Sequence, residues 1–502
     1  MRTRGTLAGL VVAGALAAVL VAATSVGARR TSADPATWKP WHLTSADQFR
    51  LPPPPTAKSA TTKKELAQLR RFQKQRTPKM LAAIKKWNGQ LAVLPWTDIF
   101  LQSFQSYRPR PPAASYNIAI LYTALFDALV AANDSRDAFA AKSRPAPSKL
   151  DPSIKPLGKV KPGSTYAPAE IAVAGAAETI LPYLFPDAPA SLYHKAASEA
   201  ANGRLWAGLN YSTDVQRARL LGQKVAQVVI AKAVTDGRAT ATGFPYPRLT
   251  GEGYWVVTPP AYEPPFGGPA GTWRPWLMSR NDQFLHAVPG PTKYGTPEYM
   301  QQLLSVLDTV NNGTDAQRKI AFFWDDGPGT VTPPGHWVAI AETLIKRYRP
   351  TNEQAVRALA YLGAAEADAA VVAWGMKYYY WSIRPITAAW RLCDGGQTLC
   401  TEAQVTADPS RATYRGKWYS PITTPAFPSY PSGHATFSGA GAGVLAYFFP
   451  TASTQVMDMA AEAAQSRVYG GIHYLEDSRD GLILGQDVAS LAIEKSKADG
   501  AG

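Results

Sequence analysis

Apolar residues recur at helical spacing along most of the chain from Thr61 onward, and this pattern constrains the fold most strongly. Residues 117–134, NIAILYTALFDALVAAND, give one such apolar stripe. Runs in which Val, Ile, Thr or aromatic residues alternate with polar ones are almost absent, so few strands are expected. We therefore predict an all-α protein whose helices form bundles.

Pro, Gly or Asn residues separate the periodic segments, as expected at helix ends. In the first half, helices are expected at residues 63–75, 79–87, 117–134, 168–184, 188–209 and 213–236. In the second half, they are expected at residues 297–311, 314–324, 334–348, 352–380, 434–449, 454–470 and 478–497. No internal repeat is obvious by eye, and two stacked helical bundles remain an open arrangement.

The N-terminus has the pattern of a targeting segment. Arg2 and Arg4 precede an apolar run from Leu7 to Ala23, and small residues follow up to Ala28. We predict that residues 1–28 are a signal peptide cleaved near Ala28, which makes the mature protein secreted. An uncleaved signal anchor is the alternative. No later stretch reaches 18 uninterrupted apolar residues, so we expect no membrane span after cleavage.

Composition divides the rest of the chain into three regions. Residues 29–60 are rich in Pro and predict an extended arm. Residues 61–290 form an N-terminal helical region that ends in a long Pro-, Gly- and aromatic-rich loop, at 237–290, of the kind that is often functional. Residues 291–502 form a second helical region, which carries the chemically informative motifs described below.

Charge and cysteine content exclude several classes of protein. The chain has 502 residues, two Cys and a net charge of +15, and removing residues 1–28 takes away two Arg, which leaves +13. Two cysteines exclude a disulfide scaffold and Cys-rich metal modules, and whether Cys393 and Cys400 pair stays open. The cations are spread over helices rather than gathered in one basic tract, so we expect no nucleic-acid partner.

The first chemical cluster is KYYYWSIRP, residues 377–385. Lys377 and Arg384 are seven residues apart, so on a continuous helix they would share one face, with Pro385 ending the helix. Two cations held in this way can clamp a tetrahedral oxyanion. A basic helix face over the core is the alternative.

The second cluster is PSYPSGHAT, residues 428–436, where a Pro-rich loop leads into a helix expected to begin near Ser432. The free N–H groups of a helix N-terminus bind anions. Ser432 can donate its hydroxyl, Gly433 permits close backbone approach, and His434 is placed for acid–base chemistry. Alternatively, Ser432 is a plain N-cap and His434 a surface residue.

The third cluster is SRVYGGIHYLED, residues 466–477. Arg467 adds a third cationic donor, and His473 and Asp477 are four residues apart, so the carboxylate can fix the imidazole tautomer. Such a His is suited to act as a nucleophile or ligand, and a surface ion pair is the alternative. Together the three clusters predict one buried anion pocket with two imidazoles. The other histidines, His42, His194, His286 and His336, have no such context.

The ordered motifs K-x6-R-P, P-S-G-H and S-R-x5-H-x3-D resemble those of the type 2 phosphatidic acid phosphatase and vanadium-dependent haloperoxidase superfamily. The resemblance implies a pocket for phosphate or the isosteric vanadate. It implies that His434 is the acid–base residue, and that His473 either bonds to vanadium or attacks phosphorus, with Asp477 as its support. The oxyanion would be bound by Lys377, Arg384, Ser432, Gly433 and Arg467.

Further features are similar to secreted bacterial and fungal-type vanadium chloroperoxidases. Trp374 and Phe427 resemble the aromatic lining of their halide pockets. The segment AFFWDDG, residues 321–327, resembles a stretch whose Asp hydrogen-bonds an anion-binding Arg, which implies that Asp326 is the partner of Arg467.

Three functions follow as hypotheses. The first is a vanadate-dependent haloperoxidase that oxidises halide with hydrogen peroxide to hypohalous acid and passes it to an organic acceptor that the sequence does not define. The second is a soluble secreted acid phosphatase that uses the same pocket and a phosphohistidine at His473. The third is a non-catalytic, basic, anion-binding secreted protein. Halide preference and oligomeric state stay open.

Overall fold

The computed structural model describes residues 34–160, 165–241, 244–247, 249–394 and 418–501. In these ranges the chain forms helices and loops, with no β-strand, which confirms the all-α prediction. The expected signal peptide and Cys400 lie outside the described residues. Residues 34–59 are irregular apart from a short 3-10 turn, Pro35–Thr37.

The helices follow the periodic segments closely. In the first half they are α1 (Ala60–Lys74), α2 (Pro78–Asn88), α3 (Val93–Tyr107), α4 (Pro111–Ala138), α5 (Pro147–Leu150), α6 (Ala169–Leu184), α7 (Ala190–Trp206) and α8 (Ser212–Ala233). In the second half they are α9 (Pro297–Asn311), α10 (Asp315–Phe323), α11 (Thr332–Tyr348), α12 (Asn352–Tyr380), α13 (Pro385–Asp394), α15 (Gly433–Phe448), α16 (Ser453–Tyr469) and α17 (Leu475–Lys497).

Apart from the four-residue α5, two helices, α3 and α13, were not expected. Pro95 lies in the first turn of α3, where its missing N–H costs nothing, and the helix then buries Phe100 and Phe104 completely. Pro385 occupies the first position of α13 in the same way, so this proline starts a helix instead of only ending one. In both helices the proline, which usually breaks a helix, is tolerated because it lies in the first turn.

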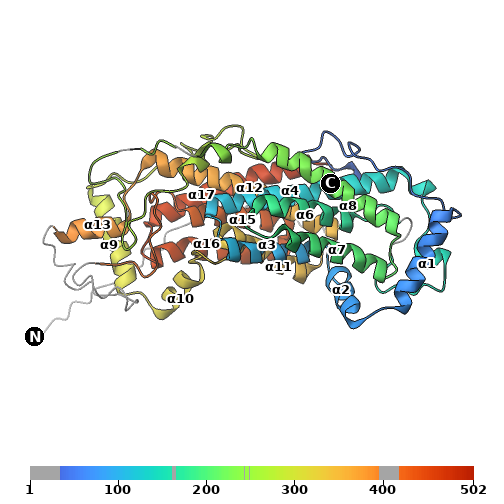
Figure 1. The fold of residues 1–502 in the computed structure, drawn as a ribbon. Coiled ribbons are helices and arrows are strands. Elements are labelled where there is room, and N and C mark those ends of the chain that lie inside the picture. The colour runs from blue at the N-terminus through green and yellow to red at the C-terminus, as the bar shows by residue number, and fades with distance from the viewer. Residues whose placement is uncertain (1–33, 161–164, 242–243, 248, 395–417, 502) are drawn as a thin grey trace, which may run out of the picture.

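Long helices run side by side along the molecule, and α4 packs against α12 in its middle (Figure 1). The pair α6 and α8 packs in the first half, and the pair α15 and α17 packs in the second. Helices α1 and α2 lie at one end of the molecule, and α9, α10 and α13 lie at the other. One hydrophobic core joins residues on both sides of position 290, so the proposed division there stays a prediction.

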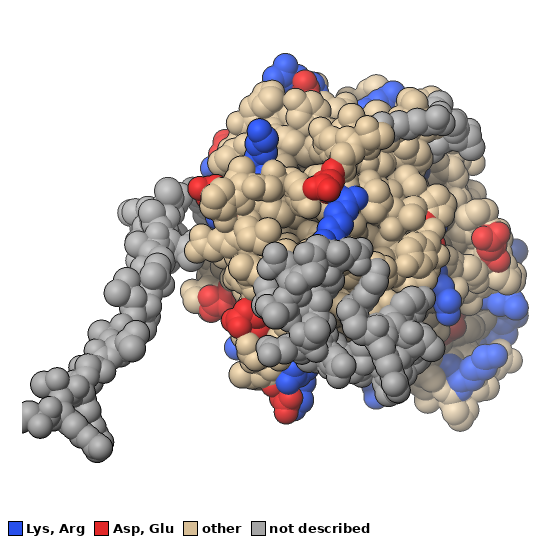
Figure 2. Space-filling view, turned by 90° about the vertical axis from the view of Figure 1, so that its left-hand side faces the viewer, with Lys and Arg blue, Asp and Glu red and all other residues tan. Residues whose placement is uncertain are grey.

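Helix α4 is the one described helix that is long and apolar enough to cross a membrane. Within it, 94% of the most apolar window is buried inside the protein, which fits a core helix. On the end face seen in Figure 2, the visible Lys and Arg side chains are interspersed with Asp and Glu over a mostly uncharged surface. The net positive charge therefore does not form one continuous patch on the described part of this face.

Two buried carboxylates hold loops onto the central helices. Asp127 of α4 accepts hydrogen bonds from the backbone N–H groups of Trp41, His42 and Leu43, at 2.7, 2.7 and 3.2 Å. Asp368 of α12 does the same for residues 276–278, at 2.6 to 2.8 Å. Burial raises the pKa of Asp127 to about 7, and the three N–H donors act in the opposite direction.

We expect Asp127→Ala to lower the free energy of unfolding by about 3 kcal/mol, because it leaves three buried N–H groups without an acceptor. Denaturant unfolding followed by circular dichroism measures this loss. Asp187→Ala is the control, since Asp187 is exposed, and it should change stability by less than about 0.5 kcal/mol. Equal losses in the two variants would contradict the structural role of Asp127.

Candidate active site

Residues of the second and third sequence clusters line one cavity of about 500 Å³. The first cluster lies behind its wall, where Arg384 Nη1 is 3.1 Å from His473 Nε2. The cavity wall includes Gly433 and His434 at the start of α15, Arg467 near the end of α16, and His473 just before α17. The long loop before α9 contributes Thr258, Pro259, Pro260 and Phe266 to the same wall. The loop thus reaches the cavity, and a functional role for it stays a prediction.

The loop also covers the C-terminal part of α12. The hydroxyl of Tyr378 donates to the carbonyl of Phe266 at 2.6 Å, and the N–H of Trp255 donates to the carbonyl of Trp381 at 2.8 Å. At Gly271 the backbone lies so close to Gly375 that an added Cβ would come within 2.5 Å of the Gly375 Cα. The loop is therefore held against the helix that supplies Lys377.

Lys377 and Arg384 do not share a helix face, contrary to the prediction. Helix α12 ends at Tyr380, and Trp381 adopts a left-handed conformation with φ of 52° that redirects the chain. Arg384 then lies immediately before α13. Both cations are nevertheless fully buried, and both lie against the ring of Phe427, which lines the cavity.

Arg384 is held by backbone carbonyls and by His473. Its Nε donates to the carbonyl of Phe427 at 2.9 Å, and its Nη1 donates to the carbonyl of Ile472 at 2.6 Å and lies 3.1 Å from His473 Nε2. Its Nη2 is buried without a hydrogen-bond partner among the described residues. Burial lowers the pKa of Arg384 to about 9, and the Asp477 carboxylate opposes this. No ion pair compensates this cation within the described ranges.

Lys377 uses all three of its N–H donors on carbonyl oxygens. Nζ lies 3.1, 2.8 and 2.5 Å from the carbonyls of Pro428, Ser429 and Pro431, which ties α12 to the loop before α15. Burial, followed by the nearby Arg384 charge, lowers the pKa of Lys377 strongly. An anion bound between these cations would act in the opposite direction.

Helix α15 begins as predicted, with Ser432 as its N-cap. The Ser432 Oγ accepts a hydrogen bond from the N–H of Ala435 at 3.3 Å, which leaves its hydroxyl hydrogen able to donate. An added Cβ at Gly433 would lie 3.3 Å from the Trp374 ring, so glycine lets the helix start close to the cavity. The free N–H groups of this first turn suit an anion.

His473 and Asp477 form the predicted contact. His473 Nδ1 lies 2.8 Å from Asp477 Oδ2, which also accepts from Ser429 Oγ at 2.5 Å and from the Tyr474 N–H at 3.2 Å. The Arg384 N–H can only donate, so His473 Nε2 is the acceptor and Nδ1 carries the hydrogen toward Asp477. Burial, then Arg384, lowers the pKa of His473 well below its usual value, which keeps the imidazole neutral.

Ser429 lies in the second sequence cluster, residues 428–436, and the sequence predicted no role for it. Its sequence position gives no sign that it reaches a carboxylate beside α17, because that contact joins residues 48 positions apart.

His434 lies on the opposite side of the site beside Arg467. Arg467 Nη1 is 3.4 Å from His434 Nε2, and the other Arg467 nitrogens donate to Ser466 Oγ and to the carbonyl of Ala321. Burial and then the Arg467 charge lower the pKa of His434 well below its usual value, while a hydrogen bond to the Asp325 backbone opposes this. His434 is therefore a neutral imidazole whose Nε2 can take a proton.

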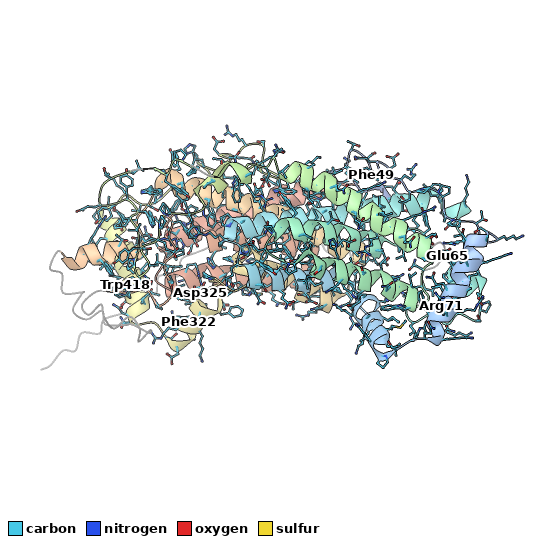
Figure 3. All side chains as sticks on the ribbon, viewed as in Figure 1. Phe49, Glu65, Arg71, Phe322, Asp325 and Trp418 are labelled. Atoms are coloured by element: carbon cyan, nitrogen blue, oxygen red, sulfur yellow. The ribbon has the colours of Figure 1, made fainter. Side chains whose placement is uncertain are left out.

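The predicted Asp326–Arg467 hydrogen bond is wrong. Both Asp326 carboxylate oxygens contact His336 Nδ1 instead, at 3.1 and 3.2 Å, and the His336 ring stacks on Trp324 with centroids 4.5 Å apart. Asp326 still lines the cavity, and with Asp325 it influences Arg467 through charge alone. Asp325 lies toward the end of the molecule that also carries Trp418 (Figure 3).

Trp374 and Phe427 are brought together as expected, with ring centroids 5.3 Å apart, and both line the cavity. Phe266 packs edge-on against Phe427 at 5.1 Å, and the motifs gave no sign of this third ring. Lys377 Nζ and the Arg384 guanidinium each lie 5.0 Å from the centre of the Phe427 ring. One aromatic side chain thus separates the two buried cations from the open cavity.

We expect a tetrahedral oxyanion to stabilise the protein against heat. Inorganic phosphate or vanadate at 100 times its dissociation constant should add about 2.7 kcal/mol, because it binds only the folded state. Differential scanning fluorimetry measures the increase in Tm. Arg467→Ala should abolish the increase, and the exposed control Arg280→Ala should retain it. An increase that survives Arg467→Ala would place the anion elsewhere.

The chain is similar to proteins of known structure. Residues 357–457 and 452–499 match the family model described as VCPO second helical-bundle domain. A bacterial vanadium-dependent iodoperoxidase shares 23% identity at a TM-score of 0.63, over 80% of this chain and 96% of that one. The apo-type bacterial vanadium-dependent chloroperoxidase shares 14% identity at a TM-score of 0.57, over 78% of this chain and 96% of that one. The holo-type bacterial vanadium-dependent chloroperoxidase shares 15% identity at a TM-score of 0.52, over 83% of this chain and 96% of that one.

No curated protein sequence matches the chain. The family match covers Lys377, His434, Arg467 and His473. Residues 357–499 are therefore similar to the second helical-bundle domain of the VCPO family, and the chain has the fold of the solved bacterial vanadium-dependent haloperoxidases.

Proposed function

We propose that the protein is a vanadate-dependent haloperoxidase that oxidises halide with hydrogen peroxide to hypohalous acid. The observation that carries the proposal is the buried, uncompensated Arg384 beside the neutral His473, which lines one cavity together with His434 and Arg467. The solved structures with this fold are described as vanadium-dependent iodo- and chloroperoxidases. Secretion is part of the proposal and rests on residues 1–28.

The residues present fit vanadate. Arg384 Nη2 is a buried donor without a partner among the described residues, and an oxyanion would provide an acceptor for it. Lys377 and Arg467 would add positive charge, and Ser432 with the Gly433 N–H would donate at the start of α15. His473 Nε2 would be the ligand for the metal, since Asp477 occupies Nδ1. Bound vanadate would supply Lewis acidity toward hydrogen peroxide.

Proton movement falls to His434. Its Nε2 faces the site beside Arg467, and its lowered pKa keeps it able to accept a proton from incoming peroxide. The Arg467 guanidinium beside it stays protonated at working pH. His434 would therefore transfer protons, and Arg467 would supply a fixed positive charge. Asp477 acts on His473 alone and is a positioning residue.

The cavity wall suits a weakly hydrated anion such as a halide. Trp374, Phe427 and Phe266 offer aromatic surface, while Arg467 provides positive charge in the same wall. Dehydrating a halide costs less than dehydrating a small hard anion, and a partly apolar site with nearby cations suits that balance. An organic acceptor would enter the same open cavity of about 500 Å³.

Purified protein loaded with vanadate should halogenate a phenolic dye when hydrogen peroxide and bromide, chloride or iodide are added. His473→Ala should lose both bound vanadium and halogenation, because the metal ligand is gone. Bound vanadium is measured by elemental analysis and halogenation by dye absorbance. Phosphatase turnover with a trapped phosphohistidine at His473, and no halogenation by wild-type protein, would establish the phosphatase instead.

His434→Ala should separate binding from chemistry. We expect the halogenation kcat to fall by a factor of about 10² to 10⁴, as for loss of a general acid–base group, while vanadium still binds at one per chain. His286→Ala is the control, because His286 is exposed. Loss of vanadium from His434→Ala would assign this residue to binding rather than to proton transfer.

A further inference from the structure

The two halves of the chain share a sequence pattern, which becomes clear once their helices are compared. Residues 199–237 read EAANGRLWAGLNYSTDVQRARLLGQKVAQVVIAKAVTDG. Residues 462–500 read EAAQSRVYGGIHYLEDSRDGLILGQDVASLAIEKSKADG. The two segments align without a gap, and more than a third of the positions are identical. They cover the ends of α7 and α16 and the whole of α8 and α17.

Other elements correspond in the same chain order. Helices α6 and α15 each have 16 residues, α7 and α16 each have 17, and α1 and α9 each have 15. Helices α3 and α11 both end at a tyrosine that is followed by Arg-Pro. The two arginines, Arg108 and Arg349, both have φ of 49°. The loops bound by Asp127 and Asp368 read WKPWHLTSADQF from residue 38 and WRPWLMSRNDQF from residue 273.

Long-range contacts repeat as well and cross between the halves. The N–H of Lys39 donates to the carbonyl of Asp499 at 2.7 Å, and the N–H of Arg274 donates to the carbonyl of Asp236 at 2.8 Å. Lys39 and Arg274 are equivalent in the two loops, and Asp499 and Asp236 are equivalent in the aligned segments. Each half therefore binds the other through the same pair of positions, as expected for a duplicated unit with approximate two-fold symmetry.

The alignment gives most residues of the active site a counterpart in the first half. Arg467 corresponds to Arg204, Asp477 to Asp214, and His473 to Asn210. Arg384 corresponds to Arg144, since each follows the central helix, precedes a proline and is fully buried. The neighbours of these arginines agree too: Arg144 stacks on Tyr211 and pairs with Asp214, and Arg384 interacts with Tyr474 and Asp477.

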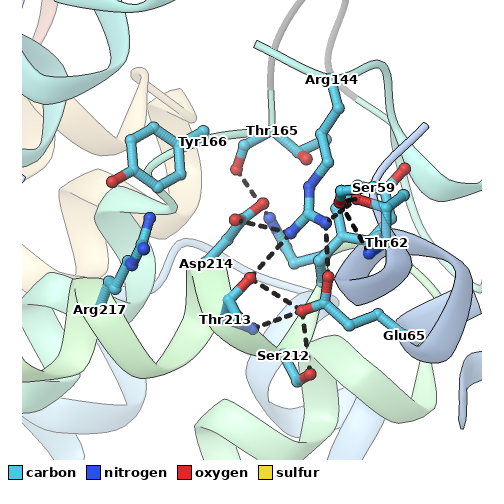
Figure 4. A network of polar contacts seen from close by, with 12 residues as sticks. Ser59, Thr62, Glu65, Arg144, Thr165, Tyr166, Ser212, Thr213, Asp214 and Arg217 are labelled. Carbon is cyan, nitrogen blue, oxygen red and sulfur yellow. Dashed lines mark hydrogen bonds and ion pairs between the residues drawn. The ribbon is translucent and has the colours of Figure 1, made fainter. Parts of the chain in front are cut away.

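The decisive difference is the charge beside this arginine. In the first half, Glu65 of α1 pairs with Arg144 at 2.5 Å and also accepts from the Thr213 N–H at 2.7 Å (Figure 4). In the second half, the position of Glu65 on α9 is Gln302, whose Nε2 donates to Glu476 at 2.8 Å. Arg144 thus has two carboxylates, and Arg384 has no ion pair among the described residues.

The counterpart site is also closed. Arg204 Nε donates to the Asn210 side chain at 2.7 Å, where the active site has a histidine. The cavity next to Arg204 and Asn210 measures only about 20 Å³, room for about one water molecule. The two sites lie at opposite ends of the molecule, as the positions of Glu65 and Asp325 show (Figure 3).

We propose that the chain is an internal duplication whose first half carries a closed counterpart of the oxyanion site. Glu65 supplies from within the chain the negative charge that the second half takes from a bound oxyanion. The first half is thereby a ligand-independent scaffold, and the second half is the one that needs an anion for full stability. The identity of that anion rests on the proposed function, and the stability difference between the halves does not.

Equivalent substitutions in the two halves test the proposal. Arg144→Met should lower the Tm of the anion-free protein by several degrees, because it leaves Glu65 and Asp214 buried without their cation. Arg384→Met should lower the anion-free Tm much less, because it removes a buried cation that has no ion pair and loses only its hydrogen bonds to two carbonyls. Vanadate binding should remain at one per chain in Arg144→Met and be lost in Arg384→Met.

Glu65→Gln gives the first half the residue type found at Gln302, and it serves where Arg144→Met fails to fold. It should lower the Tm and leave vanadate stoichiometry unchanged, and Gln302→Ala is the control at the equivalent position. Two vanadates per wild-type chain, or a tenfold weaker binding in Glu65→Gln at unchanged Tm, would overturn the proposal. Should the wild-type chain bind neither vanadate nor phosphate, the proposed function fails. The unequal Tm effects of Arg144→Met and Arg384→Met then still test the charge difference between the halves, and equal losses would overturn it.

Discussion

A buried positive charge without a carboxylate partner is the interaction on which the rest of this structure depends. Arg384 and Lys377 are fully buried and bind mainly backbone carbonyls, which satisfy most of their N–H groups without neutralising their charge. Burial lowers the pKa of both side chains, which expresses the cost of holding two cations in one place. A bound oxyanion removes that cost. The folded protein is therefore preorganised to bind an anion.

The central helices make this arrangement possible. Helix α12 packs against α4 and α15, and its buried length fixes where Lys377 and Trp374 meet the start of α15. The loop before α9 closes over its last turns and supplies Phe266 to the cavity. A neutral His473 and a neutral His434 follow from the same burial and from the neighbouring cations, so ligand binding and proton transfer share one electrostatic cause.

The first half solves the same electrostatic problem without a ligand. Glu65 and Asp214 surround Arg144, so that region is complete once folded. Glu65 on α1 and Gln302 on α9 differ by a single carboxylate. That one charge distinguishes a structural ion-pair cluster in the first half from a ligand site in the second. Duplication followed by such a change leaves one half free to specialise in stability and the other in chemistry.

The sequence by itself determined the helical architecture, most helix limits, and the residues that meet at the cavity, because periodicity, N-caps and motif spacing act over a few residues. Tertiary structure decided the rest. It placed Arg384 beyond the end of α12, paired Asp326 with His336 instead of Arg467, and brought Ser429 to Asp477. The last two contacts depend on which charged groups meet across the chain, and that is set only when the helices pack.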